Sequence, residues 1–380
     1  MHSLFLLSSL FALFNLIMSL TLPAPSGPLG VEISSLQLTD YSRPNPWAAE
    51  PPHRSIMVST FTPVGSQTNC NMSSIPYMPT AVAEYYDETY SAYGIPNGTF
   101  TSISQPNCDL TARSVVQGAS DYPVLLFLSG LGNSRFLYSA LASQISSFGL
   151  TVITIDHPYD AAIVQLADGS TVTSVDISTK LQIVKALGVR TKDISFFVSE
   201  LLDPQQHILP YRHDTKPPTI MIAGHSLGGA TAAEALLSIP QLKAGANLDG
   251  SFWGQATKET TTWSKPFLLF GHANKIETDP TWASIVPRLL GAKAYVELHD
   301  AADGSFTDLP YLVELLGLAD KLPKAVSKLL GTIDGYDAFR AVSDIVVAWF
   351  KDVCGTGGTG SVRQVRKVAR KDPHLTFVSI

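Results

Sequence analysis

Short runs of apolar residues recur along the chain and predict buried strands. Runs with no alternation of polar residues are typical of strands that are covered on both faces, as in a parallel sheet. Segment 55–64 also has the composition of a strand. The continuous apolar runs are 123–128, 150–155, 219–223 and 266–270.

Segments with helical character separate these runs, so that strand and helix alternate. This order predicts an α/β fold with a mostly parallel central sheet and helices on both faces. No internal repeat interrupts it, and we expect a single domain over residues 31–351. The helical segments are 136–148, 178–202, 228–237 and 338–351.

Three segments stand outside this alternation. Residues 3–20 are nearly uncharged and rich in Leu and Phe, and a Pro-containing turn follows them, so residues 1–22 predict a secretory signal peptide. An uncleaved membrane anchor is the alternative. Segment 65–120 is rich in Pro, Asn and Ser and predicts a surface excursion, and residues 355–380 predict a flexible Gly-rich linker with a basic tail.

Two sequons and two cysteines in the excursion favour export. Asn71 and Asn97 each begin an acceptor sequence for glycosylation, and Cys70 and Cys108 flank them, which suggests a disulfide bond. The alternative is that the sequons arise by chance and the thiols are reduced. Cys354 is left over, and no cysteine spacing indicates a metal site.

Composition narrows the classes of function. Of the 380 residues 15% are charged, against roughly 25% in an average protein, and the formal net charge is −6. The chain is therefore not a disordered tail protein, and its mild acidity argues against a nucleic-acid partner. Composition does not indicate an oligomeric state.

The first candidate for chemistry is the segment Gly-His-Ser-Leu-Gly at 224–228, between the apolar run 219–223 and a helical segment. A tight turn from strand to helix needs small residues on either side of a projecting serine. Ser226 is therefore the candidate nucleophile; an ordinary Gly-rich turn is the alternative. The backbone N–H groups of Leu227 and Leu131 are candidate donors to an oxyanion.

Asp249 is the candidate carboxylate. It follows the short segment 244–248, about one helix and one strand after the nucleophile. Carboxylates at the carboxyl ends of strands lie where α/β enzymes build their sites. A turn aspartate before glycine is an equal alternative.

These motifs resemble the fungal branch of the platelet-activating-factor acetylhydrolases, secreted-type α/β-hydrolases that cleave short or oxidised sn-2 acyl chains from phospholipids. The resemblance covers residues 31–351 and implies that Ser226 is the nucleophile, Asp249 the triad acid, and Leu131 and Leu227 the oxyanion donors. It implies neither a metal nor an organic cofactor. The matching segments are 36–44, 129–139, 156–160, 224–231, 247–252, 266–274, 279–282 and 304–308.

The chain departs from this family at the general base. The family carries its catalytic histidine three residues before the Phe that corresponds to Phe306, and here that position is Asp303. A carboxylate is a much weaker base near neutral pH than an imidazole. Asp303 is also expected to face Asp249, and two close carboxylates require a proton or a cation between them.

The other histidines that could serve as the general base differ in their position along the chain. His299 ends the strand-like segment 294–298 and is the fallback base, provided that the loop after it differs from that of the family. His272 and His157 follow strands, but the resemblance makes them structural. His225 is expected to point away from the nucleophile.

The sequence therefore predicts a serine-type acyl-ester hydrolase that acts on a phospholipid. The alternatives are a generic small-ester or polyester hydrolase and a catalytically impaired ester or lipid binder. Segment 309–330 interleaves Leu with Lys, so it either forms a transient contact with a lipid surface or packs as a helical pair on the sheet.

Overall fold

A computed structural model describes residues 20–48, 52–67, 70–109, 122–206, 208–209, 217–355 and 362–380. Almost all of the predicted signal peptide lies outside the described residues. So does most of the predicted Gly-rich linker. Among the described residues, no helix combines the length and the apolar character needed to cross a membrane.

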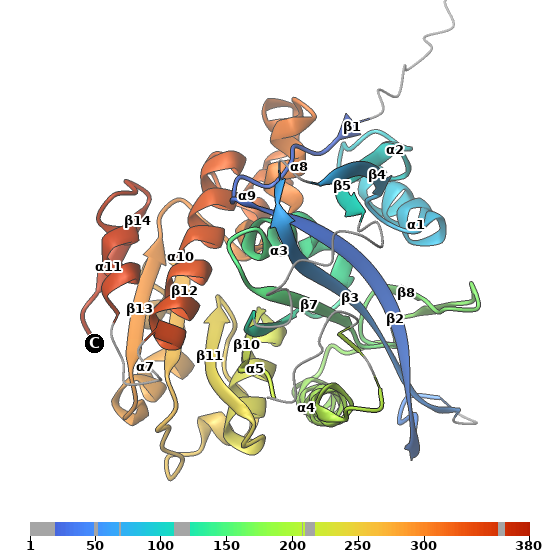
Figure 1. The fold of residues 1–380 in the computed structure, drawn as a ribbon. Coiled ribbons are helices and arrows are strands. Elements are labelled where there is room, and N and C mark those ends of the chain that lie inside the picture. Colours follow the sequence, from blue (N-terminus) through green and yellow to red (C-terminus); the bar gives the residue numbers. More distant parts are fainter. Residues whose placement is uncertain are drawn as a thin grey trace, which may run out of the picture.

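A nine-stranded sheet forms the centre of the molecule (Figure 1). Its inner strands run parallel to one another, and the strands at both edges are antiparallel. The predicted α/β class is therefore confirmed. In spatial order the strands are β14 (Leu375–Val378), β13 (Lys293–Leu298), β12 (Phe267–His272), β11 (Leu242–Leu248), β10 (Ile220–His225), β6 (Val124–Leu128), β7 (Thr151–Asp156), β3 (His53–Ser66) and β2 (Leu29–Pro44).

Helices cover both faces of the sheet because alternate strand residues point to opposite sides. Leu125 and Phe127 of β6 face the core that α3 (Ser139–Ser146) and α10 (Gly335–Gly355) cover. Leu126 and Leu128 face the opposite core, under α4 (Lys180–Leu202) and α5 (Leu227–Ser238). The continuous apolar runs in the sequence reflect this double burial.

The region predicted as a surface excursion is an ordered layer that packs on the main core. It contains β4 (Asn71–Pro76), α1 (Thr80–Ser91), α2 (Thr99–Ser102) and β5 (Ile103–Asp109). With β1 (Leu20–Thr21), the two strands form a three-stranded sheet. Tyr77, Tyr86 and Phe100 are buried in the main core. Aromatic side chains scattered among polar residues therefore anchor this layer.

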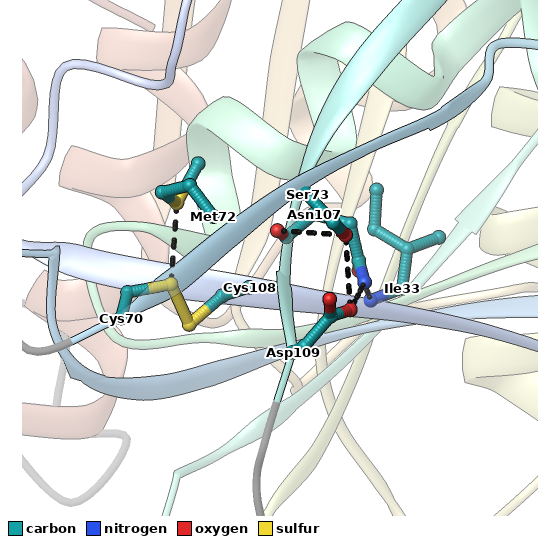
Figure 2. The surroundings of a disulfide bond; sticks show 7 residues. All are labelled: Ile33, Cys70, Met72, Ser73, Asn107, Cys108 and Asp109. Carbon is teal, nitrogen blue, oxygen red and sulfur yellow. Dashed lines mark hydrogen bonds between the residues drawn. A yellow bond between two sulfur atoms is a disulfide. The ribbon is translucent and has the colours of Figure 1, made fainter.

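A disulfide bond joins Cys70 to Cys108, and Figure 2 shows its surroundings. It links the start of β4 to β5, which pair in antiparallel register. Beside it, the Asn107 side chain accepts a 2.8 Å hydrogen bond from the backbone N–H of Ile33 on β2 (Figure 2). The disulfide thus braces two strands of the small sheet, and the bond from Ile33 to Asn107 holds that sheet against β2 of the large one.

The basic C-terminal tail that follows the predicted Gly-rich linker is folded. It forms α11 (Arg363–Ala369) and β14, which pairs with β13. The Asp352 carboxylate accepts hydrogen bonds from the backbone N–H groups of Gln364 and Val365, 2.8 and 3.2 Å long. Val365, Ala369 and Leu375 of the tail are buried, while its basic residues are exposed.

Segment 309–330 packs on the core as two short helices, α8 (Leu309–Leu315) and α9 (Lys324–Leu330). Leu309, Leu312 and Leu330 are buried, and Leu329 is exposed. This arrangement matches the packing alternative for the segment. The remaining elements are β8 (Ile163–Gln165), β9 (Thr171–Thr173), α6 (Lys275–Thr278) and α7 (Pro280–Ile285).

Asp308 links three parts of the fold, and we expect its removal to be costly. Its buried carboxylate accepts hydrogen bonds from the Tyr77 hydroxyl and from the N–H groups of Ala140 and Leu141. Asp308→Ala leaves three buried donors without an acceptor and should lower the free energy of unfolding by about 3–5 kcal/mol. The exposed N-terminal cap of α10, Asp334, is the control, because Asp334→Ala should cost about 1 kcal/mol. Urea denaturation measures both, and equal losses would contradict the assignment.

Candidate active site

Ser226 lies on a sharp turn between β10 and α5. Its backbone has φ 52° and ψ −121°, a region that non-glycine residues rarely occupy. Small neighbours make this turn possible: a Cβ on Gly224 would lie 2.3 Å from the Gly228 backbone, and one on Gly250 would lie 2.0 Å from the Ser226 carbonyl oxygen. The strained turn predicted from the sequence is therefore present.

Asp249 follows β11, the strand next to β10, and its carboxylate is buried. Its Oδ1 atom accepts hydrogen bonds from His272 Nδ1 at 2.7 Å and from the His272 backbone N–H at 3.0 Å. Lys275 Nζ lies 3.5 Å from the same oxygen. Asp249 is therefore held by β12 and α6 in an arrangement that suits an anion.

His272 was expected to be structural, and the structure places it against the candidate triad acid. Because an ionised carboxylate only accepts hydrogen bonds, the bond to Asp249 places a proton on Nδ1 of His272. The His272 side chain is 29% exposed. The signal for this contact was its position directly after a buried strand that neighbours the strand of Asp249.

Asp303, at the start of a 3₁₀ turn (Asp303–Phe306), faces Ser226 and His225. Its Oδ1 lies 3.3 Å from His225 Nε2, and the Asp303 side chain is 51% exposed. Partial burial raises the pKa of the Asp303 carboxyl, but His225, Lys275 and the Ser226 hydroxyl outweigh it and lower that pKa to about 2. Asp303 is therefore a carboxylate at neutral pH.

Lys275 supplies the cation expected near the two carboxylates. Its ammonium group contacts Asp249 and also lowers the pKa of Asp303. The lysine is largely buried. In the described part of the chain, no group of three or more His, Cys, Asp or Glu side chains is placed to hold a metal ion. The charge balance of the site is thus met by a side chain of the protein.

His225 does not point away from the site, which corrects the prediction for this residue. Its ring is buried against Phe306, and its Nε2 faces Asp303. On the other side, Nδ1 lies 2.8 Å from the Tyr138 hydroxyl. Burial lowers the pKa of His225, but the Asp303 carboxylate more than offsets this, so the net shift is upward.

The other two histidines lie elsewhere. His299 Nε2 forms a 2.7 Å hydrogen bond with Thr376 Oγ1 of β14, so the structure does not bring the fallback base to Ser226. His157 is buried, and its Nδ1 lies 2.9 Å from Asp193, which also binds Arg54. This buried ion cluster gives His157 a structural role, as the resemblance implies.

The proposed oxyanion donors sit on two fixed turns. Leu227 is the first residue of α5. The turn that carries Leu131 is held by Arg190, whose guanidinium donates to the carbonyl oxygens of Ser129 and Gly130 at 2.6 and 3.1 Å. The Asp160 carboxylate in turn holds Arg190. A buried ion pair thus fixes the backbone of this turn.

An apolar cluster adjoins both of these turns. Its core includes Leu227 and Ala230 of α5, and Leu131 packs against it. Side chains of α4 and of three loops complete it. Its other members are Ala186, Leu187, Trp47, Ile177, Ile183 and Trp253. Leu131, Leu227 and Ala230 thus place apolar side chains at the two turns beside the candidate nucleophile.

Comparisons with known proteins show which proteins this chain resembles. Residues 83–185 match the family model described as platelet-activating factor acetylhydrolase, isoform II. A probable 1-alkyl-2-acetylglycerophosphocholine esterase of Arthroderma benhamiae is 28% identical over 88% of both chains. Bovine platelet-activating factor acetylhydrolase is 28% identical over 34% of this chain and 35% of its own.

The fold has a solved counterpart. A ferulic acid esterase from Streptomyces cinnamoneus superposes with a TM-score of 0.76 over 95% of this chain and 100% of its own, at 24% identity. This likeness identifies the α/β-hydrolase fold. The sequence matches confirm the resemblance predicted from the motifs: the chain is similar to the platelet-activating-factor acetylhydrolases.

Proposed function

We propose that the protein is a serine-type carboxylic ester hydrolase that works through an acyl-enzyme on Ser226. The observation that carries this proposal is the position of Ser226, on a strained turn between β10 and α5 and facing an ionised carboxylate. Such a turn exposes a nucleophilic oxygen at the carboxyl edge of the sheet. The named activity of the relatives points to the same chemistry.

The surroundings of Ser226 fit the steps of acyl transfer. The serine oxygen attacks the ester carbonyl, and the N–H groups of Leu131 and Leu227 hold the oxyanion that forms. The acyl chain lies against the apolar cluster beside these turns. No step requires a metal or an organic cofactor.

The substrate we propose is a phospholipid with a short or oxidised sn-2 acyl chain. Support comes from the Arthroderma relative, whose name specifies an acetylglycerophosphocholine ester and which aligns over 88% of its length. A generic small-ester or polyester hydrolase would differ only in the pocket for the acyl group. A binder without activity would keep Ser226 but fail to activate it.

We further propose that the protein is secreted as a glycoprotein after cleavage of the N-terminal signal peptide before β1, because β1 pairs with β5 in the folded protein. Asn71 and Asn97 are both exposed, as glycosylation requires, and they lie on the layer that carries the disulfide bond. Disulfide bonds persist in oxidising compartments. An uncleaved N-terminal anchor is the alternative for the same route.

Labelling with a fluorophosphonate tests the nucleophile. We expect one adduct, located by peptide mass spectrometry on Ser226, because only an activated serine reacts. Hydrolysis of matched phosphatidylcholines with sn-2 acetyl and sn-2 palmitoyl chains then tests the substrate, with the acetyl ester expected to react faster. Absence of an adduct would reject the enzyme, whereas an adduct with equal rates on both lipids would reject only the substrate.

A further inference from the structure

We propose that Ser226, Asp303 and His225 act as a triad in which the carboxylate and the imidazole have exchanged places. Asp303 receives the proton of Ser226 directly, and His225 is the positioning residue behind it. This inference rests on the proposed esterase function and assigns its general base. We refer to these residues as the Ser226–Asp303–His225 set.

Contact with the nucleophile is the first argument. Among the described side chains near Ser226, Asp303 interacts with the serine hydroxyl. One side of the carboxylate meets His225, and half of the side chain remains exposed. A base in this position can take a proton from Ser226 and then meet a leaving group that arrives from solvent.

The hydrogen bonds of Tyr138 determine which ring nitrogen of His225 carries the proton. The Tyr138 oxygen accepts from the Gly130 N–H and from the Asn133 side chain, both at 2.9 Å. Its only proton is therefore left for His225 Nδ1, 2.8 Å away. Nδ1 accepts, so the ring proton is on Nε2.

This tautomer points an N–H at Asp303. His225 Nε2 is buried, and no group forms a hydrogen bond of standard geometry with it among the described residues. The Asp303 oxygen 3.3 Å away is at ion-pair distance. A small movement of the exposed Asp303 side chain would complete the bond as the carboxylate orients toward Ser226. His225 therefore supports the anion and cannot itself take the serine proton.

The second imidazole near the site, that of His272, is hydrogen-bonded to Asp249. His272 donates from Nδ1 to Asp249, and its backbone N–H binds the same oxygen. Lys275 lies beside Asp249 as well. These contacts tie Asp249 and His272 together on β11 and β12, so Asp249 stabilises the site without orienting a base at position 303.

The reaction balances with these groups alone. Ser226 Oγ bonds to the ester carbonyl carbon while its proton passes to an Asp303 oxygen. The bond from that carbon to the alcohol oxygen then breaks, and the Asp303 proton passes to the alcohol. Water repeats the sequence on the acyl-enzyme: its proton passes to Asp303 and then to Ser226 Oγ as the acyl bond breaks, which releases a carboxylic acid.

A carboxylate base gives a pH profile unlike that of an imidazole base. The charged and titratable groups that face Asp303 are His225, Lys275 and, through His225, Asp249 and Tyr138. The pKa of Asp303 is lowered, so its basic form is present above that pKa and is lost only when the pH falls through it. Activity should therefore persist well into the acid range.

The test is the pH dependence of kcat/KM for a soluble acetyl ester, measured between pH 4.5 and 8 on the full-length protein. We expect the wild-type value at pH 4.5 to remain within about threefold of that at pH 7. An unperturbed imidazole base of pKa about 6.5 would lose about 100-fold over the same range. Asp303→Asn should lower kcat/KM at pH 7 by about 10²-fold, and the exposed Asp320→Asn should not.

A second variant tests the role of His225 without replacing it. Tyr138→Phe removes the hydroxyl that donates a hydrogen bond to His225 Nδ1. The His225 ring can then carry its proton on Nδ1, which leaves the lone pair of Nε2 facing Asp303. The pKa of Asp303 should rise from about 2. The acid limb of kcat/KM, followed for this variant and for the wild type down to pH about 2, should therefore move up by about one pH unit. Tyr311→Phe, whose ring stacks on Phe339, should leave the limb unchanged. A limb that does not move in Tyr138→Phe would contradict the role of His225.

Different results reject the Ser226–Asp303–His225 set and the esterase function. If fluorophosphonate labels Ser226 but the rate falls tenfold per pH unit below about 6.5 and Asp303→Asn does not change it, the Ser226–Asp303–His225 set is rejected. Loss of labelling in His272→Asn would then assign the base to His272. If Ser226 is not labelled at any pH from 4.5 to 8, the esterase function itself is rejected.

Discussion

Replacement of Ser226 by alanine should lower kcat/KM for a short-chain ester by at least about 10⁴-fold. No neighbouring group replaces its oxygen in the proposed mechanism, because Asp303 takes the serine proton and His225 only supports Asp303. The free energy of unfolding should change little. Alanine has the same difficulty as serine at φ 52°, so the strain in the turn is retained.

The control for this variant is Ser251→Ala. Ser251 lies two residues after Asp249 and donates a 2.6 Å hydrogen bond to Asp279, so it is a nearby serine with a structural partner. We expect Ser251→Ala to keep most of the activity and to retain labelling at Ser226. Equal activity of Ser226→Ala and the wild type would show that any ester hydrolysis comes from a contaminant or from another site.

Asp303→His should raise kcat/KM at pH 7.5 by about 10²-fold or more, because an imidazole accepts a proton near neutral pH far better than a carboxylate does. The new imidazole would occupy the position from which the Asp303 side chain contacts the Ser226 hydroxyl. The hydrogen bonds and the lysine contact of Asp249 reach its Oδ1 atom, which leaves Oδ2 to orient the new imidazole. The acid limb should move up at the same time, toward pH about 6.5.

The surface variant Asp320→His is the matched control, because it makes the same change of charge on an exposed residue. It should leave both kcat/KM and its pH profile unchanged. If Asp303→His shows no gain, adding His272→Asn tests whether competition for Asp249 is the cause. No gain in the double variant would show that position 303 does not receive the serine proton in either form.

The parallel core was predictable because its signal is local. Continuous apolar runs report burial on both faces, and β6, β7, β10 and β12 lie within one or two residues of the predicted ranges. β2 was not predicted, since its exposed and half-buried positions carry polar residues over much of its length. α1, α11 and β14 gave only weak signals, because a few aromatic or aliphatic anchors hold each of them against residues distant in the sequence.

The candidate site, like the fold, could be predicted from the sequence only in part. Ser226 and Asp249 follow strands, so their placement at one edge of the sheet could be inferred from order alone. The meeting of His225 with Asp303 depends on the inward turn of the His225 ring and on Tyr138, which contacts it across 87 positions of sequence. No local pattern encodes that contact. His272 was assigned a structural role because its partner, Asp249, is identified only by the register of β11 and β12.

β14 also protects the edge of β13 from pairing with other molecules. It covers the edge of β13 with an antiparallel strand only four residues long, and Leu375 anchors it in the core. Without this strand, β13 would present unpaired backbone N–H and C=O groups, which readily recruit strands of other molecules. The last residues of the chain thus act as a cap on the sheet, and a purification tag is better placed elsewhere than on this end.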